Sequence, residues 1–298
     1  MLGRFLADTF IKPFQSPVFD DPSNYGLEHE EVTFRAADGI ELSGWLIKGD
    51  TGRVIIQSHF GVQCSRSGYR PRGLLRGYDK DIAFLRQAKY LNEAGYTVLM
   101  YDFRNHGKSG EGTLPFITWA DEEAKDVIAA VDYISTHSDY RDAHIGLLSI
   151  CMGQGASVAA FGRDDGLRQR PRVKAMISVQ PMDYGCFVRA LGLPNFVIRS
   201  VDKAIERKTG KDYNAISWRP FIRDVSVPTL VIQNKNDGYL DEAFVNSVYD
   251  DLGVEKEMLW IDIPKKKGGA FPNRAAAYDW LGETPEPILG WFGKHLAH

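Results

Sequence analysis

The sequence predicts an α/β fold in which a mostly parallel central sheet carries helices on both faces. Short, nearly continuous apolar runs are typical of strands buried on both faces. Helix-like stretches between such runs are typical of a parallel sheet covered by helices. The apolar runs are Arg53–Ser58, Thr97–Asp102, Ile145–Ser149, Lys174–Val179, Thr229–Gln233 and Met258–Ile263. The helix-like stretches are Tyr78–Ala94, Thr118–His137, Met152–Phe161 and Asp241–Leu252.

An antiparallel hairpin is predicted before the first of these runs. Apolar and polar residues alternate over Glu30–Ala36, a turn follows at Ala37–Gly39, and Ile40–Ile47 forms a second strand. The hairpin supplies one edge and brings the sheet to about eight strands. Catalytic residues are then expected on the loops that follow the carboxyl ends of the strands.

The composition is that of one globular domain covering residues 1–298, because 44% apolar and 25% charged residues are ordinary values. A net charge of −3 gives no overall field that would attract nucleic acid or an anionic membrane, so neither is predicted as a partner. The three cysteines are too few, and odd in number, for a disulfide framework. No signal peptide or run of roughly 20 apolar residues is present, which predicts a cytoplasmic location; the oligomeric state stays open.

Two connections are longer than usual for such a fold and are expected to carry function or to cover a site. One runs from Gly61 to about Gly77, and the other from Pro181 to about Val227. The second contains a helical run, Val197–Lys208, and predicts an inserted cap at residues 182–222. The segment Leu2–Phe10 also has helical spacing. It is expected to pack on its own domain, or else to form a flap over the site or a membrane-surface helix.

The most informative stretch lies where the strand Ile145–Ser149 runs through Cys151 and Gly153 into a helix. A nucleophile on such a strained strand-to-helix turn needs small residues two positions before and after it. The start of the following helix favours an anion beside it. Cysteine is also among the most buried residue types, so a structural thiol is the alternative.

This turn resembles the G-x-S-x-G nucleophile elbow of the α/β-hydrolase superfamily. Ser149 stands for the first glycine and Cys151 for the serine, as in thiol-elbow members such as dienelactone hydrolases. Asp102–Gly110 resembles the family's D-x-R-G-x-G-x-S loop, with Asn105 in place of a glycine. That loop is structural in the family, so His106 is expected to have a structural role.

The resemblance also implies an oxyanion hole and a catalytic acid. His59-Phe60-Gly61 resembles the family's H-G-x turn, with Phe60 at the glycine position. The backbone N–H of Gly61 or Phe60 and that of Met152 would then face a developing oxyanion. Asp237 takes the position of the triad acid, because nearby Asp241 is interpreted as the N-cap of the next helix.

The family's catalytic histidine has no counterpart in the loop Ile263–Asn273. Three hypotheses follow. Cys151 could act without a classical base, helped by the elbow helix and a nearby lysine, since cysteine tolerates this better than serine. His59 or Lys267 could replace the base. The fold could instead have lost hydrolysis and serve binding.

The leading hypothesis is a hydrolase or acyl transferase that acts on an ester, lactone or thioester of a small molecule. The rival is a non-hydrolytic homologue that binds a small molecule or a partner protein. Arg70 and Arg72 lie in the basic stretch Gln63–Lys80 and suggest an acidic substrate, such as a carboxylate or a coenzyme A-linked or carrier-linked one, unless this is a solvated loop. No metal-ligand spacing or phosphate loop appears, so no metal or cofactor is predicted.

Overall fold

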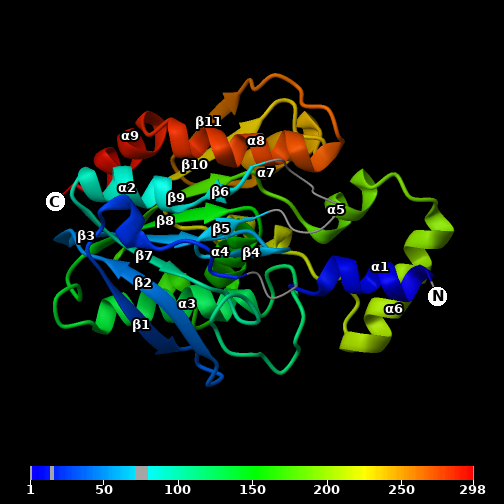
Figure 1. Ribbon diagram of the computed structural model, residues 1–298, viewed down its shortest axis with the longest axis horizontal. Coiled ribbons are helices and arrows are strands. Elements are labelled where there is room, and N and C mark those ends of the chain that lie inside the picture. Colours follow the sequence, from blue (N-terminus) through cyan, green and yellow to red (C-terminus); the bar gives the residue numbers. More distant parts are fainter. Residues whose placement is uncertain (1, 14–16, 71–79, 298) are drawn as a thin grey trace.

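A computed structural model describes residues 2–13, 17–70 and 80–297. Its centre is an eight-stranded sheet in the order β1-β2-β7-β3-β8-β9-β10-β11 (Figure 1). Only β2 runs antiparallel to its neighbours, and every other neighbouring pair is parallel. The strands are β1 His29–Arg35, β2 Glu41–Ile47, β3 Asp50–Ser58, β7 Tyr96–Tyr101, β8 His144–Ile150, β9 Val173–Val179, β10 Thr229–Asn234 and β11 Lys256–Ile261. The predicted hairpin and all six predicted strands are therefore confirmed, although β11, at the edge of the sheet, is only partly buried.

Helices cover both faces of the sheet, as the alternating pattern predicted. In Figure 1, α2 and α9 lie on one face, while α3 and α4 lie on the other. Strands β7 and β8 are buried along nearly their whole length because each is sandwiched between these layers. The helices are α2 Leu85–Glu93, α3 Glu123–Thr136, α4 Met152–Gly162, α7 Glu242–Asp251, α8 Ala270–Glu283 and α9 Glu286–His295.

A small three-stranded sheet was not predicted. It joins β4 Cys64–Ser65, β5 Gly68–Tyr69 and β6 Ile82–Ala83. The helix expected over Tyr78–Ala94 begins only at Leu85, because Ile82 and Ala83 pair with β5 instead. Two-residue strands leave no periodicity in the sequence, which explains why this sheet could not be anticipated.

The long connection between β9 and β10 forms α5 Tyr184–Ala190, α6 Asn195–Thr209 and the 3₁₀ helix η3 Arg219–Asp224. The N-terminal helix α1, Leu2–Ile11, packs along α6 (Figure 1). The Phe10 ring meets the Phe187 ring edge-on at 5.3 Å, and Lys208 forms an ion pair with Asp8. Helix α1 thus packs on its own domain, as expected, and its Thr9 also borders the cavity that contains Cys151. In the described ranges no helix has the length and apolarity to cross a membrane.

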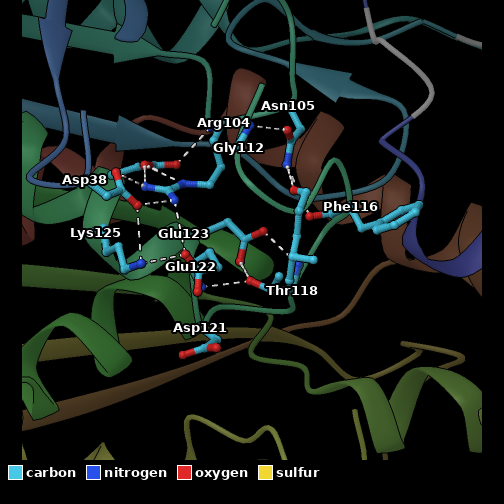
Figure 2. Close-up of polar contacts among 12 residues, drawn as sticks. Asp38, Arg104, Asn105, Gly112, Phe116, Thr118, Asp121, Glu122, Glu123 and Lys125 are labelled. Atoms are coloured by element: carbon cyan, nitrogen blue, oxygen red, sulfur yellow. Dashed lines mark hydrogen bonds and ion pairs between the residues drawn. The ribbon is translucent and has the colours of Figure 1, made fainter. Parts of the chain in front are cut away.

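The loop after β7 is held by a buried ionic network centred on Arg104 (Figure 2). The guanidinium is 2% exposed and donates to Asp126 from Nε at 2.9 Å and from Nη2 at 2.7 Å. It also reaches Asp38 and Glu122. Arg104 thus joins the turn that contains Asp38, the loop after β7 and helix α3. A buried ion pair such as Arg104–Asp126 is stable only because its charged groups are fully hydrogen-bonded.

A second buried pair, Arg66 with Asp102, fixes the loop after β3. Arg66 Nη1 lies 2.7 Å from Asp102 Oδ2, and both side chains are fully buried. The same carboxylate accepts the backbone N–H groups of Arg66 at 2.6 Å and Lys108 at 2.9 Å. Arg66, counted in the basic stretch, is therefore a structural residue that stacks over Trp45.

Replacing Arg66 by Met should destabilise the protein by about 3–5 kcal/mol, because Asp102 would stay buried without its countercharge. Arg70→Met is the matched control. It removes an exposed pair with Asp81 and should cost about 0–1 kcal/mol. Urea unfolding of both variants at pH 7 measures the difference. Equal losses in the two variants would contradict the structural role of Arg66.

Candidate active site

Cys151 lies at a strained turn between β8 and α4, where the sequence placed it. Its φ of 53° and ψ of −104° are sparsely populated for a residue with a side chain. A Cβ on Gly153 would come within 2.7 Å of the Ser58 carbonyl oxygen, so only glycine fits two positions after Cys151. Two positions before it, Ser149 is accommodated because its Oγ shares a 2.8 Å hydrogen bond with Ser157 Oγ.

Cys151 opens onto a cavity of about 290 Å³. Gly61, Phe60 and Met152, the three residues expected around an oxyanion, line the same cavity. Gly61 and Met152 are neighbours, because a Cβ on Gly61 would lie 3.0 Å from Met152 Sδ. All three residues that were expected to form an oxyanion hole thus border the space next to Cys151.

Most of the remaining lining is apolar and aromatic. The connection between β9 and β10 supplies Met182 and Phe187, and the N-terminal helix supplies Thr9. The other contributors are Val62, Gln63, Tyr69, Ile117, Trp119, Tyr239, Phe271, Arg274 and Tyr278. A lining of this kind suits a small, largely apolar ligand that is oriented by a few polar groups.

Asp237 is buried after β10, as predicted, but its partner is an arginine. Arg274 Nη1 lies 2.5 Å from Asp237 Oδ2, and both side chains are nearly inaccessible to solvent. The carboxylate also accepts Gln233 Nε2 at 2.9 Å and the Tyr239 backbone N–H at 2.9 Å. Arg274 thus occupies the position beside the acid that the α/β-hydrolase resemblance assigns to a histidine.

Two asparagines bring Arg274 to this place. The carbonyl of Asn273 accepts Nδ2 of Asn234 at 2.9 Å, which ties the start of α8 to the end of β10. The side chain of Asn273 bonds back to the Lys266 backbone at 2.7 and 3.1 Å and closes the preceding loop. The next residue, Arg274, then points to Asp237. Arg274 directly follows the loop Ile263–Asn273, where a base was expected. A basic residue at this position was the signal in the sequence that could have identified it.

Tyr278 stands one helical turn after Arg274 and was also missed. Its hydroxyl oxygen accepts the Nε–H of Arg274 at 2.9 Å. Burial raises the pKa of Tyr278 well above its ordinary value; the nearby Arg274 charge opposes this rise, and the Cys151 side chain adds to it. Tyr278, Arg274 and Asp237 therefore form one hydrogen-bonded chain at the edge of the cavity onto which Cys151 opens.

Neither residue predicted as a replacement base lies in this chain. The Nδ1 of His59 donates to the Phe60 carbonyl at 2.6 Å, and its Nε2 accepts the Phe103 backbone N–H at 3.2 Å. Both ring nitrogens are thus used by the backbone. Lys267 is exposed on the loop before α8 and, like His59, is absent from the described cavity lining. The position that each was expected to fill is taken by Arg274.

His106 is structural, as the resemblance implied: its Nε2 lies 2.9 Å from the Gly61 carbonyl and its Nδ1 lies 2.8 Å from the Arg104 carbonyl. Arg70 pairs with Asp81 at 2.7 Å and stacks over Phe19, so its charge is already matched. Arg72, the other predicted anion-binding residue, lies outside the described residues. Within the described ranges, no three His, Cys, Asp or Glu side chains gather as metal ligands would.

Comparison with known proteins assigns the fold. The serine aminopeptidase S33 family matches residues 78–207, which include the elbow but end before Asp237 and Arg274. The protein YfhR of Salmonella typhimurium is 24% identical over 268 residues, 88% of this chain and 81% of its own. The Pyrococcus furiosus esterase Pf2001 superposes with a TM-score of 0.68 at 18% identity, covering 97% of this chain and 99% of its own. The chain has the α/β-hydrolase fold.

His59 should make stability depend on pH. Burial lowers the pKa of His59 well below 6.5, so below that pH the unfolded chain binds a proton that the folded chain does not. Folding stability is therefore lost as the pH falls from 7 to 5. His59→Gln should reduce this loss by up to about 2 kcal/mol. Urea unfolding of both proteins at the two pH values tests this, and an identical loss in the variant would refute it.

Proposed function

We propose that the protein is a hydrolase or acyl transferase that acts on an ester, lactone or thioester through Cys151. The observation that carries the proposal is the position of this thiol. It lies on a strained turn at the start of α4 and faces a cavity, with Gly61 and Met152 beside it. A protein that used the cysteine only for packing would have no need of an unfavourable backbone conformation at this residue.

In this reaction the Sγ of Cys151 attacks the substrate carbonyl carbon and forms a tetrahedral adduct. The backbone N–H groups of Met152 and Gly61 stabilise the oxyanion, and such donors are effective because they are fixed before the charge appears. The adduct then collapses to a thioester on Cys151 and releases the alcohol or thiol. Water completes hydrolysis, whereas a second alcohol, thiol or amine completes acyl transfer.

The cavity favours a small, uncharged acyl group. Its volume of about 290 Å³ lies at the lower end for ligand sites, and its lining is largely apolar. The one cation in the described lining, Arg274, is already neutralised by Asp237. An acidic substrate would therefore lack a free countercharge here. A simple ester or lactone fits better than a large coenzyme-linked substrate.

The comparisons support a hydrolase function in general. An esterase from Pyrococcus furiosus and the α/β-hydrolase GrgF of a Penicillium species share the fold, the latter with a TM-score of 0.61 at 20% identity over 91% of this chain and 100% of its own. The competing function is non-hydrolytic binding of a small molecule, which the presence of Arg274 in place of a histidine favours. Covalent chemistry at Cys151 distinguishes the two.

Incubation with p-nitrophenyl acetate should add one acetyl group to Cys151, which intact mass spectrometry detects. The adduct should disappear as the ester is consumed, because the thioester turns over. Cys151→Ala should form no adduct. Cys186→Ala is the matched control and should behave as the wild type, since this buried cysteine lies on α5, outside the described cavity lining. Absence of any adduct on the wild type would favour the binding function.

A further inference from the structure

We propose that Tyr278, oriented by Arg274, donates and accepts the protons in the reaction at Cys151 and takes the place of the histidine of the family. This inference rests on the proposed function and names the missing acid–base group. It requires that Tyr278 shares the cavity with the reacting sulfur, that its proton is not used by Arg274, and that the ring cannot turn away. The contacts of Tyr278, Arg274 and Phe60 meet these requirements.

The direction of the phenolic proton follows from the hydrogen bonds. The Tyr278 oxygen accepts the Nε–H of Arg274 at 2.9 Å, so the tyrosine proton must point elsewhere. Both Tyr278 and Cys151 line the same cavity, and the Cys151 side chain adds to the rise in the pKa of Tyr278. The tyrosine proton is therefore available to a group that is bound in the cavity next to Cys151.

The guanidinium that orients Tyr278 is itself held at two other points. Arg274 Nη1 donates to Asp237, and its Nη2 donates to the carbonyl of Gln180, directly after β9. Asp237 thus acts on the arginine as a triad acid acts on a histidine, by fixing its orientation and balancing its charge. Asp237, the acid of the family pattern, therefore still has a role in this site: it orients Arg274 in place of a histidine.

Phe60 holds the ring of Tyr278 from the other side. Their rings stack at 4.9 Å with an interplanar angle of 16°. Phe60 occupies the position where the family's oxyanion turn has glycine, and Arg274 occupies the position of the histidine. Both departures from the family pattern therefore contact the same side chain, Tyr278. A glycine at position 60 would leave Tyr278 without this support.

The reaction is balanced with Tyr278 as the only proton carrier. The Cys151 thiolate forms a C–S bond as the ester C–O bond breaks, and the leaving alkoxide takes the phenolic proton, giving an alcohol and a phenolate beside the Arg274 cation. Water then attacks the thioester and gives a proton to the phenolate. The C–S bond breaks, which releases the carboxylic acid and restores the thiolate and the phenol. No oxidant, metal or cofactor is needed.

Electrostatics suits both halves of this cycle. Burial raises the pKa of Tyr278, so the phenol keeps its proton until a stronger base, an alkoxide, forms next to it. The resulting phenolate is a strong base for deacylation. A thiolate leaving group needs no such proton, so the site favours oxygen esters and lactones over thioesters.

The test compares Tyr278→Phe with the wild type on two kinds of ester. An aryl ester has a good leaving group and acylates Cys151 without an acid, so the p-nitrophenol burst should change by less than about threefold. An alkyl ester or lactone needs the proton, and its turnover should fall about 10²–10³-fold, within the usual range for general acid–base catalysis. A merely structural role would slow both substrates alike.

Tyr90→Phe is the matched control. Its hydroxyl donates to the Leu281 carbonyl at 3.1 Å, so the variant removes a phenolic oxygen that contacts the same helix outside the described cavity lining. It should leave both rates unchanged. Equal alkyl-ester turnover in Tyr278→Phe and the wild type would overturn this inference and leave the proposed function intact. A wild type that never becomes acylated on Cys151 would overturn both.

Discussion

The buried ion pair between Arg274 and Asp237 is the constraint on which the site depends. Two charges taken out of water are stable together only when their remaining hydrogen-bonding groups are satisfied. Here Asp237 is satisfied by Gln233 and a backbone N–H, and Arg274 by Gln180 and Tyr278. The pair therefore locks the ends of β9 and β10 to helix α8. It also fixes the groups that face Cys151.

In this α/β-hydrolase fold Cys151 occupies the strand-to-helix turn, and no histidine is among the described residues that line its cavity. The fold supplies the strained turn, the helix start and the loop after β3, because these follow from strands that end at one edge of the sheet. The departures from the family pattern, Phe60 and Arg274, both contact Tyr278. These two departures are consistent with a single change in the site, in which both residues position Tyr278.

The fold was predictable because buried parallel strands leave continuous apolar runs and the elbow leaves a short local pattern. The surroundings of Asp237 were not predictable, because Arg274 meets Asp237 across 37 residues of sequence. His59 was predicted as a base because imidazole is a common general base. In the folded protein, however, both ring nitrogens of His59 hydrogen-bond to the backbone. Arg66 and Arg70 look alike in sequence, but one is fully buried against Asp102 and the other is exposed. Such differences depend on tertiary packing, which a local pattern does not contain.

The most direct test of the account is alkylation of the native protein by iodoacetamide at neutral pH, with the sites mapped by peptide mass spectrometry. The three cysteines are all buried, but only Cys151 lines the described cavity. Burial raises the pKa of Cys64 well above its ordinary value and that of Cys186 to about 12, so both serve as internal controls. The account predicts that Cys151 is modified first and alone. Modification of Cys151 no faster than of Cys64 and Cys186, or only after unfolding, would contradict it.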